Sequence, residues 1–363
     1  MFQKLKNIYH LLQAILANIL FGFPSRKLKV IGITGTDGKT TTTHLIAHIL
    51  KTAGKKASFV SSIHASIGGK ESDIGFHVTT PSSFALQKLL KQSADNHDEY
   101  FVLETTSHAL DQNRVWGVNY EVGIITNITH EHLDYHKNYE EYVKTKLKLL
   151  EMAKVGIRHT DKIANIVKQI PNLTLFNKHN YSSAFMVCKE LGISDKEILK
   201  AMMMFELPKG RVDLVYDKDF KVIIDFAHTP NALLQLLPAV RKRYLKKGGR
   251  LIHVFGSAGL RDFTKRPLMG EASAKYSDVI LITEEDYRTE DLKKICEQIG
   301  SGIKNKGYKI IVDRQDAINQ AIKIAKTGDI VVLTGKAHEK SLCRGKTEEP
   351  WDEYKAVEKA LEL

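Results

Sequence analysis

The stretch of residues 29–53 constrains the fold more than any other part of this chain. Residues 29–34 form an apolar run typical of a short buried strand, and a glycine-rich segment, Gly35-Thr-Asp-Gly-Lys-Thr-Thr41, follows directly. A helix is expected from about residue 40 to residue 53. A strand, a glycine-rich turn and a helix in this order are typical of a parallel α/β sheet. Backbone N–H groups at such a helix N-terminus bind phosphate, so the segment predicts a nucleotide site.

The glycine-rich segment is a variant of the P-loop, because position 33 is Ile and the usual spacing between the glycines is not met. In P-loops the lysine contacts the β- and γ-phosphates and the next hydroxyl ligates Mg²⁺. These roles are predicted here for Lys39 and Thr40. The alternative, a glycine turn before any helix, does not account for the Lys-Thr run. ATP is the expected cofactor, held by Gly35, Thr36, Asp37, Gly38, Lys39, Thr40 and Thr41.

Alternating strands and helices continue on both sides of a break at residues 205–211. The pattern predicts strands at residues 57–62, 100–104, 122–127, 221–226, 250–255, 279–283, 308–312 and 330–334, and helices at residues 82–92 and 139–150. It therefore indicates an α/β protein with a P-loop-containing central ATPase domain, whose sheet is mostly parallel, and a C-terminal Rossmann-like α/β domain. The expected divisions are an N-terminal helical segment, 1–28, a shortened central domain, 29–206, and a C-terminal domain, 207–363.

Polar residues end three of the predicted strands: Thr34, Glu104 and Asn127. Ligands of parallel sheets bind beyond the carboxyl ends of the strands. Glu104 could hold Mg²⁺ there with its oxygens, or could be an ordinary surface acid. Residues 130–136, His-Glu-His-Leu-Asp-Tyr-His, are dense in ligand types and favour a metal or anion site over structural histidines. The absence of CxxC and HExxH patterns argues against catalytic zinc.

The composition narrows the class of protein. Lys plus Arg, 54, minus Asp plus Glu, 42, leaves a formal charge of +12. Such an excess suits nucleic acid, membrane surfaces or anionic small molecules. No basic stripe with interleaved aromatic residues is present, so nucleic acid is disfavoured. The three cysteines, Cys188, Cys296 and Cys343, lie far apart, which indicates reduced thiols and a cytoplasmic protein.

An apolar segment at residues 11–23 follows Lys4 and Lys6. It is too short to span a bilayer, which needs about 20 apolar residues. No small-residue cleavage site follows, so a signal peptide is disfavoured. A helix packed on the body of the protein is the favoured interpretation. The alternative is peripheral membrane contact through residues 1–24, with the helix lying on the membrane surface.

Seven motifs occur in an order that resembles the Mur ligase family, and two of them resemble its MurE type. The motifs are Gly35-Thr-Asp-Gly-Lys-Thr-Thr41, Thr79-Thr-Pro81, Glu104-Thr-Thr-Ser-His-Ala-Leu110, Asn127-Ile-Thr-His-Glu-His-Leu-Asp-Tyr-His136, Asp225-Phe-Ala-His-Thr-Pro-Asn231, Arg261-Asp-Phe-Thr-Lys-Arg-Pro267 and Gly335-Lys-Ala-His-Glu339, of which the last two are MurE-like. The resemblance covers roughly residues 29–363. It implies an ATP-dependent, ADP-forming ligase of peptidoglycan synthesis. Such an enzyme adds the third amino acid, diaminopimelate or lysine, to UDP-N-acetylmuramoyl-L-alanyl-D-glutamate.

The resemblance also implies roles for individual residues. Catalysis is assigned to Lys39, Lys146, Glu104 and His132. Two Mg²⁺ ions are assigned to Thr40, Glu104, His132 and a carbamylated Lys146. The rest of the nucleotide is assigned to Asn177, Asn180, Arg211 and Asp225. The muramoyl dipeptide is assigned to Thr79, Thr80, Ser107, Gln112 and Arg114, and the incoming amino acid to Arg261, Asp286, Arg288, Gly335 and Glu339.

Three differences from the family pattern bear on the substrate. Residues before the first strand do not match the family's first domain, which grips UDP. The stretch between Lys146 and Phe176 is short. The family's Asp-Asn-Pro-Arg signature is here Glu285-Asp-Tyr-Arg288. A ligase acting on a lipid-linked, poly-amino-acid or folyl-type acceptor and a non-catalytic nucleotide-binding protein are therefore retained as alternatives. We expect a monomer.

Overall fold

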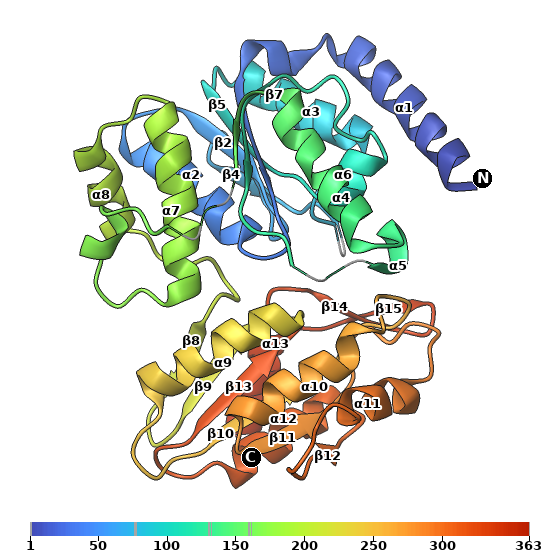
Figure 1. The fold of residues 1–363 in the computed structure, drawn as a ribbon, viewed down its shortest axis with the longest axis vertical. Helices are drawn as coiled ribbons and strands as arrows, with labels where there is room; N and C mark the ends of the chain where they lie inside the picture. Colours follow the sequence, from blue (N-terminus) through green and yellow to red (C-terminus); the bar gives the residue numbers. More distant parts are fainter. Residues whose placement is uncertain are drawn as a thin grey trace. The chain divides into compact units, whose positions relative to one another are not determined.

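The computed structural model describes residues 2–75, 78–129, 131, 133–158, 160 and 162–362. The chain divides into two compact units (Figure 1). The N-terminal unit comprises residues 1–129 and 136–206, and the C-terminal unit comprises residues 130–135 and 207–363. Both are α/β units with mostly parallel sheets, as the sequence predicts.

The sheet of the N-terminal unit has the strand order β4-β3-β2-β5-β1-β6-β7. The strands are β1 (Lys29–Thr34), β2 (Ala57–Val60), β3 (Ala65–Ile67), β4 (Lys70–Ser72), β5 (Tyr100–Glu104), β6 (Tyr120–Ile125) and β7 (Ala153–Ile157). Strands β2, β5, β1, β6 and β7 run parallel, and only the β3–β4 end is antiparallel. Strand β1 is therefore central, between β5 and β6, and its carboxyl end leads into the glycine-rich loop.

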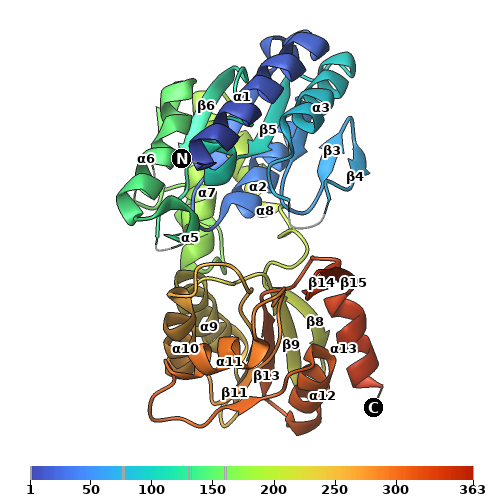
Figure 2. The ribbon, with the colours of Figure 1, turned by 90° about the vertical axis from the view of Figure 1, so that its right-hand side faces the viewer.

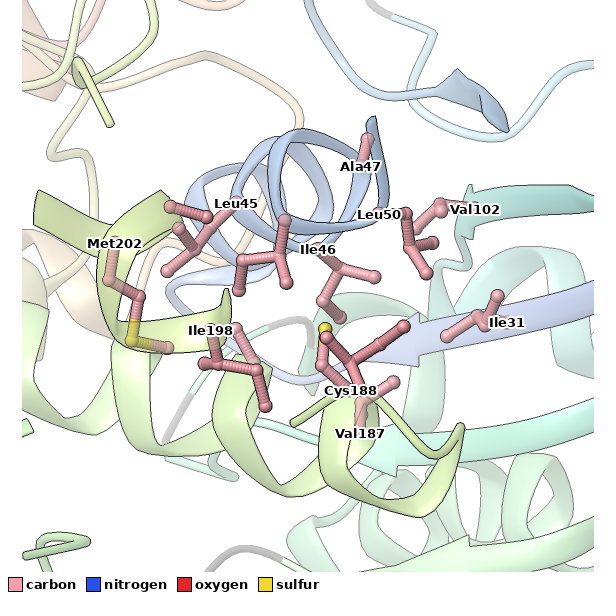
Figure 3. Packing of buried hydrophobic residues seen from close by; sticks show 14 of the residues in the cluster. Ile31, Leu45, Ile46, Ala47, Leu50, Val102, Val187, Cys188, Ile198 and Met202 are labelled. Atoms are coloured by element: carbon pink, nitrogen blue, oxygen red, sulfur yellow. The ribbon is translucent and has the colours of Figure 1, made fainter. Parts of the chain in front are cut away.

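Helices cover both faces of this sheet. They are α1 (Phe2–Phe21), α2 (Lys39–Thr52), α3 (Ser83–Asp95), α4 (Ser107–Asp111), α6 (Tyr139–Met152), α7 (Leu175–Glu190) and α8 (Asp195–Met203), with short 3₁₀ turns η1 (Pro24–Lys27) and η2 (Val167–Gln169). The short helix α5 (Leu133–His136) falls mostly within residues 130–135, which belong to the C-terminal unit. On one face α2, α7 and α8 bury a core that includes Ile31, Ile46, Val187 and Ile198 (Figure 3). On the other face Leu86 and other apolar residues of α3, α4 and α6 form a second core.

Helix α1 begins earlier than the sequence pattern indicates and spans 20 residues. Its inner face packs against α3, and Ala14, Ala17 and Asn18 are fully buried. Packing on the body of the unit agrees with the favoured interpretation. In the described part of the chain, no helix combines the length and apolar character needed to cross a membrane.

The sheet of the C-terminal unit has the order β12-β11-β10-β13-β9-β8, in which only β8 is antiparallel. The strands are β8 (Asp213–Asp217), β9 (Lys221–Asp225), β10 (Leu251–Phe255), β11 (Val279–Ile282), β12 (Lys309–Ile310) and β13 (Ile330–Thr334), with a separate hairpin of β14 (Ser341–Arg344) and β15 (Thr347–Pro350). Helices α9 (Pro230–Tyr244), α10 (Lys265–Tyr276) and α11 (Leu292–Gly300) contribute to one core, and α12 (Arg314–Ile324) and α13 (Glu353–Leu361) to the other.

Candidate active site

The glycine-rich loop is held in a fixed shape by the segment that follows β6. Asn127 Oδ1 accepts from the backbone N of Asp37 at 2.9 Å, and Asn127 Nδ2 donates back to the Asp37 carbonyl, also at 2.9 Å. Thr126 Oγ1 donates to the same carbonyl at 2.7 Å. Two glycines are required sterically. A Cβ on Gly35 would lie 1.9 Å from Thr126 Oγ1. Gly38, the N-cap residue of α2, has a φ of +81°, which favours glycine.

Lys39 begins helix α2, and its side chain folds back over the loop. Its Nζ donates to the carbonyl oxygens of Gly35, at 3.1 Å, and Thr36, at 2.8 Å. The ammonium thus lies over the loop, beside the N-terminus of α2. This arrangement combines a lysine cation with the partial positive charge of a helix N-terminus, which suits an anion. Thr41, in the first turn of α2, is buried.

Thr40 and Glu104 come together at the carboxyl edge of the sheet. Thr40 Oγ1 donates to Glu104 Oε1 at 3.2 Å and lies 2.9 Å from Ser62 Oγ. The other carboxylate oxygen, Oε2, accepts from the backbone N of Ser62 at 3.0 Å. Glu104 is buried. The pair supplies a hydroxyl and a carboxylate, the hard oxygen donors that Mg²⁺ prefers.

Lys146 reaches the same loop from helix α6. Its Nζ donates to the Gly35 carbonyl at 2.6 Å and lies 4.5 Å from the centre of the Tyr142 ring. The side chain is buried. Lysine is almost never fully buried in soluble proteins without a compensating role, so the location marks Lys146 as a functional candidate. By sequence alone it resembled a surface lysine.

A third group of predicted residues surrounds β5 and α4. Thr80 Oγ1 donates to the Glu104 carbonyl and accepts from the backbone N of Thr106, both at 2.9 Å. Arg114 Nη1 donates to the Thr80 carbonyl at 2.8 Å. Ser107 Oγ lies 3.0 Å from His136 Nε2, and burial lowers the pKa of His136 to about 4. Thr79 immediately precedes Thr80, and Gln112 is the C-cap of α4.

Asn177 and Asn180 lie one turn apart on α7, with Nδ2 of Asn180 donating to Oδ1 of Asn177 at 3.4 Å. Both side chains are buried. A Cβ on Gly38 would lie 2.1 Å from Asn180 Oδ1, so Asn180 borders the glycine-rich loop. The structure therefore brings residues separated by more than 100 positions in the sequence to one loop.

In the C-terminal unit, Asp225 accepts backbone hydrogen bonds from Val212 and Ala227, each at 2.7 Å. Burial raises the pKa of Asp225, and the neighbouring Arg211 partly offsets that effect. Arg211 donates to the Gly210 carbonyl at 3.0 Å, and its guanidinium lies 4.9 Å from the centre of the Phe226 ring.

A buried ion network joins two more of the predicted residues, Asp286 and Glu339. Lys336 Nζ donates to Asp286 Oδ1 at 2.8 Å and to Glu339 Oε2 at 2.6 Å. Burial alone lowers the pKa of Lys336, but the two carboxylates outweigh it and leave that pKa raised. The backbone N of Cys343 also donates to Asp286 Oδ1, at 2.9 Å. The network therefore connects β13 and its following loop with the hairpin β14–β15.

Arg288 and Gly335 lie beside this network. Arg288 has a φ of +52°, and its Nη1 donates to the Gly259 carbonyl at 2.7 Å. A Cβ on Gly335 would lie 2.6 Å from Glu285 Oε2. Burial, followed by the negative charge of Asp286, raises the pKa of Glu285 to about 7. Arg261 is exposed in the loop before α10.

The histidine-rich segment is only partly described. His130 and His132 lie outside the described residues, so the roles predicted for His132 stay predictions. Glu131 pairs with Lys265, whose Nζ lies 2.9 Å from Glu131 Oε1. Among the residues that the structure describes, no group of three or more His, Cys, Asp or Glu side chains is arranged to hold a metal ion.

Sequence reasoning did not single out Ser62, Glu285 or Lys336 as site residues. Ser62 ends the strand predicted at residues 57–62, and polar residues at strand ends were the signal that identified Glu104. Lys336 stands inside the motif Gly335-Lys-Ala-His-Glu339. Its partner Glu339 belongs to the same motif, but its other partner, Asp286, is 50 residues away, so the sequence did not show the network that the three residues form.

Comparison with known proteins decides the family. Residues 33–191 match the Mur ligase middle domain, and residues 210–337 match the Mur ligase glutamate ligase domain. A UDP-N-acetylmuramoyl-L-alanyl-D-glutamate–2,6-diaminopimelate ligase of Aquifex aeolicus is 39% identical over 368 residues, covering 89% of this chain and 75% of the relative. The chain belongs to the Mur ligase family. It is an ATP-dependent ligase of the MurE type, and this family uses divalent metal ions.

Solved structures agree with this assignment. A UDP-N-acetylmuramoyl-L-alanyl-D-glutamate–2,6-diaminopimelate ligase superposes with a TM-score of 0.57 at 26% identity, covering 92% of this chain and 78% of that one. A Mycobacterium tuberculosis folylpolyglutamate synthase complexed with ADP gives a TM-score of 0.69 at 15% identity, covering 90% and 91%. The second similarity concerns the fold alone.

Proposed function

We propose that this Mur ligase joins diaminopimelate to a carboxylate of the D-glutamate residue of UDP-N-acetylmuramoyl-L-alanyl-D-glutamate. The observation that carries the proposal is the similarity, over 89% of the chain, to a relative whose name states this reaction. The residues of the N-terminal unit support the ATP-dependent half of the reaction, and those of the C-terminal unit support amino acid binding.

The first half activates the acceptor. A carboxylate oxygen of the acceptor attacks the γ-phosphorus of ATP, the bond to the β–γ bridging oxygen breaks, and ADP leaves. The product is an acyl phosphate. Both reactants are anionic, so the step needs positive charge at the γ-phosphate. The Nζ of Lys39 donates to two carbonyls of the glycine-rich loop, and we propose that this ammonium supplies that charge.

Thr40 and Glu104 are the residues that we propose hold Mg²⁺. Their donor set, a hydroxyl and a carboxylate within hydrogen-bond distance of each other, fits that ion. When bound, Mg²⁺ neutralises phosphate charge. Glu104 is itself oriented by the backbone N of Ser62, so the protein fixes the carboxylate independently of any metal. We propose a second Mg²⁺ that is held with His132 and Lys146.

Lys146 is proposed to act after carbamylation. Its neutral Nζ would attack the carbon of CO₂, form an N–C bond and release one proton, and the side chain would become an anion with two oxygens. In the described structure Nζ donates to the Gly35 carbonyl at 2.6 Å. A carbamate on this nitrogen would therefore be within reach of the glycine-rich loop. Thr79, Thr80, Ser107, Gln112 and Arg114 are proposed to hold the muramoyl dipeptide.

The second half forms the amide. The amine of the amino acid attacks the acyl carbon, phosphate leaves, and the amine loses a proton. The amino acid must be held by groups of both signs, since it carries a carboxylate and an ammonium. Arg288 and Arg261 offer guanidinium groups that pair bidentately with a carboxylate. Glu339 and Asp286, held by Lys336, offer acceptors for an ammonium.

Release of phosphate from ATP tests this proposal. We expect release only when Mg²⁺, a muramoyl-dipeptide acceptor and an amino acid are all present, and diaminopimelate should give a higher rate than lysine. Lysine lacks the distal carboxylate that an arginine would bind. Release that ignores the acceptor, or no release with any acceptor, would contradict the proposal.

A lipid-linked acceptor is the second candidate. The observation that favours it is that large apolar side chains of α1, among them Leu12 and Leu16, are more than half exposed. Parallel assays with UDP-linked and lipid-linked muramoyl dipeptide separate the two. The first candidate is supported if kcat/KM for the UDP-linked acceptor, in detergent-free buffer, is at least as high as kcat/KM for the lipid-linked acceptor. Turnover of only the lipid-linked acceptor supports the second candidate.

A further inference from the structure

Helix α1 has an outer face that the fold of its own unit does not cover. Six large apolar side chains on this helix are each between 54% and 66% exposed. They are Ile8, Tyr9, Leu12, Leu16, Ile19 and Leu20, which we call the α1 stripe. Their spacing of three and four residues places them along one side of the helix. Figure 2 shows α1 beside α3 on the outside of the unit.

The inner face of α1 fixes the direction in which the stripe points. Asn18 is fully buried, and its Nδ2 donates to the Trp116 carbonyl at 2.8 Å. Asn7 Nδ2 donates to Asp111 Oδ2 at 3.1 Å. Just after the helix, Ser25 Oγ donates to the Gly117 carbonyl at 3.2 Å. The helix is therefore attached along its length, and turning the stripe inward would break these contacts and expose Ala14 and Ala17.

The charged residues of the segment that carries the stripe, residues 1–36, are all basic. Residues 1–36 contain five lysines and arginines, and the first acidic residue of the chain is Asp37. The cations are Lys4, Lys6, Arg26, Lys27 and Lys29. Lys6, Arg26 and Lys27 are exposed. Lys29 is exposed as well, although it pairs with Glu99 at 3.1 Å.

These observations favour one occupant for the stripe. A second copy of the chain would bring like charges together, because residues 1–36 offer no acid to pair with the cations. The core of a protein interface is usually rich in aromatic residues, and the stripe contains one, Tyr9. An apolar stripe flanked by cations matches a bilayer that carries anionic headgroups.

We propose that α1 seats this protein on the surface of an anionic membrane. The α1 stripe enters the boundary between headgroups and acyl chains, and Lys6, Arg26 and Lys27 approach the lipid phosphates. The helix lies in the plane of the bilayer and does not cross it. The proposal does not depend on the substrate, because it rests on residues outside the candidate active site.

Co-sedimentation of the full-length protein with vesicles tests the proposal. The wild type should bind mixed vesicles of phosphatidylglycerol and phosphatidylcholine. Its affinity for vesicles of pure phosphatidylcholine should be at least about tenfold lower. Addition of 0.5 M NaCl should weaken the binding to the mixed, anionic vesicles. The variant Leu12→Ser/Leu16→Ser should lose at least about tenfold in affinity, because two apolar side chains no longer leave water. Since both residues are exposed, its thermal midpoint should match the wild type.

A matched control and a second readout complete the design. Met203→Ser/Met204→Ser removes two side chains of similar exposure, 62% and 60%, at the end of α8, and should bind as the wild type does. In Leu16→Trp, the tryptophan emission should shift to the blue on anionic vesicles and be quenched by brominated lipid.

Three outcomes would overturn the proposal. The first is a wild type that does not bind anionic vesicles. The second is a Leu12→Ser/Leu16→Ser variant that binds as tightly as the wild type or no more weakly than the Met203→Ser/Met204→Ser control. The third is a dimer in sedimentation velocity that Leu12→Ser/Leu16→Ser dissociates, which would assign the stripe to a second copy.

Discussion

Two buried lysines, one in each unit, have different surroundings. Lys146 and Lys336 are 1% and 0% exposed. Lys336 donates to two carboxylates, Asp286 and Glu339, so its charge is balanced within the folded chain. Lys146 donates to a neutral carbonyl of the glycine-rich loop and lies over the ring of Tyr142.

The difference indicates what each lysine is for. A buried charge with hydrogen-bonded partners of opposite sign holds those partners in place, and removing it leaves them uncompensated. The Nζ of Lys146 lies 2.6 Å from the Gly35 carbonyl of the glycine-rich loop, so Lys146 keeps the catalytic role proposed above. For Lys336 we propose a positioning role toward Asp286 and Glu339.

The largest expected effect is on catalysis, from Lys146→Ala. Loss of a group that stabilises the reaction should lower kcat by about 10²- to 10³-fold while the thermal midpoint changes little. Added formate or acetate should restore part of the rate if a carbamate carboxylate is the acting group. The matched control is Lys148→Ala, two positions later on α6, where the side chain is 42% exposed. Near-wild-type turnover in Lys146→Ala would remove the distinction between the two lysines.

Lys336→Met, unlike Lys146→Ala, should lower the stability of the protein. Removing one partner of a buried ion network typically costs about 3–5 kcal/mol of unfolding free energy. Urea denaturation of Lys336→Met should show that loss, and the triple variant with Asp286→Asn and Glu339→Gln should recover part of it. Lys346→Met, an exposed change in the turn of the hairpin β14–β15, is the control. If Lys336→Met were as stable as the wild type, the ion network of Lys336 would not stabilise the fold.

Glu285, beside the Lys336 network, should make the stability of the protein depend on pH. Its pKa is raised from 4.5 to about 7, so between these values the folded protein binds more protons at this site than the unfolded chain does. Stability from this group therefore falls as the pH rises through that window. Glu285→Gln should be more stable than the wild type at pH 8, on the order of 1–3 kcal/mol, with the gap closing toward pH 5. A gap that does not change with pH would show that Glu285 titrates normally.

The smallest expected effect concerns Ser62. Ser62→Ala removes the hydroxyl that lies 2.9 Å from Thr40 Oγ1 but keeps the backbone N–H to Glu104. One hydrogen bond is worth about 1 kcal/mol, so the Mg²⁺ concentration for half-maximal activity should rise about fivefold. Ser61→Ala, at the neighbouring position, is the control. An unchanged Mg²⁺ requirement would exclude Ser62 from the support of the Thr40–Glu104 pair.

Elements with strong local patterns could be predicted from the sequence, and elements with weak patterns could not. Strand β1, the loop and α2 follow from local chemistry, and the structure places β1 and α2 within one residue of the predicted bounds. Strand β8, which contains charged and half-buried residues, and the short hairpin β14–β15 were missed because their patterns are weak. The strand predicted at residues 308–312 is reduced to Lys309–Ile310.

Contacts between distant residues were beyond the reach of sequence patterns. The hydrogen bond between Lys146 and Gly35 joins residues 111 positions apart, and only the resemblance to the Mur ligases pointed to Lys146. The outer face of α1 shows a related limit. The sequence shows a helix with apolar residues on many sides, but only packing against α3 determines which of them stay exposed.

An oxygen-transfer experiment tests whether this enzyme forms an acyl phosphate. Both carboxylates of the D-glutamate residue of UDP-N-acetylmuramoyl-L-alanyl-D-glutamate are labelled with ¹⁸O. The labelled acceptor reacts with ATP, Mg²⁺ and diaminopimelate, and the released phosphate is analysed by mass spectrometry. We predict that each phosphate carries a single ¹⁸O atom and that phosphate and amide product form in equal amounts. Amide product accompanied by unlabelled phosphate would show that the reaction does not pass through an acyl phosphate.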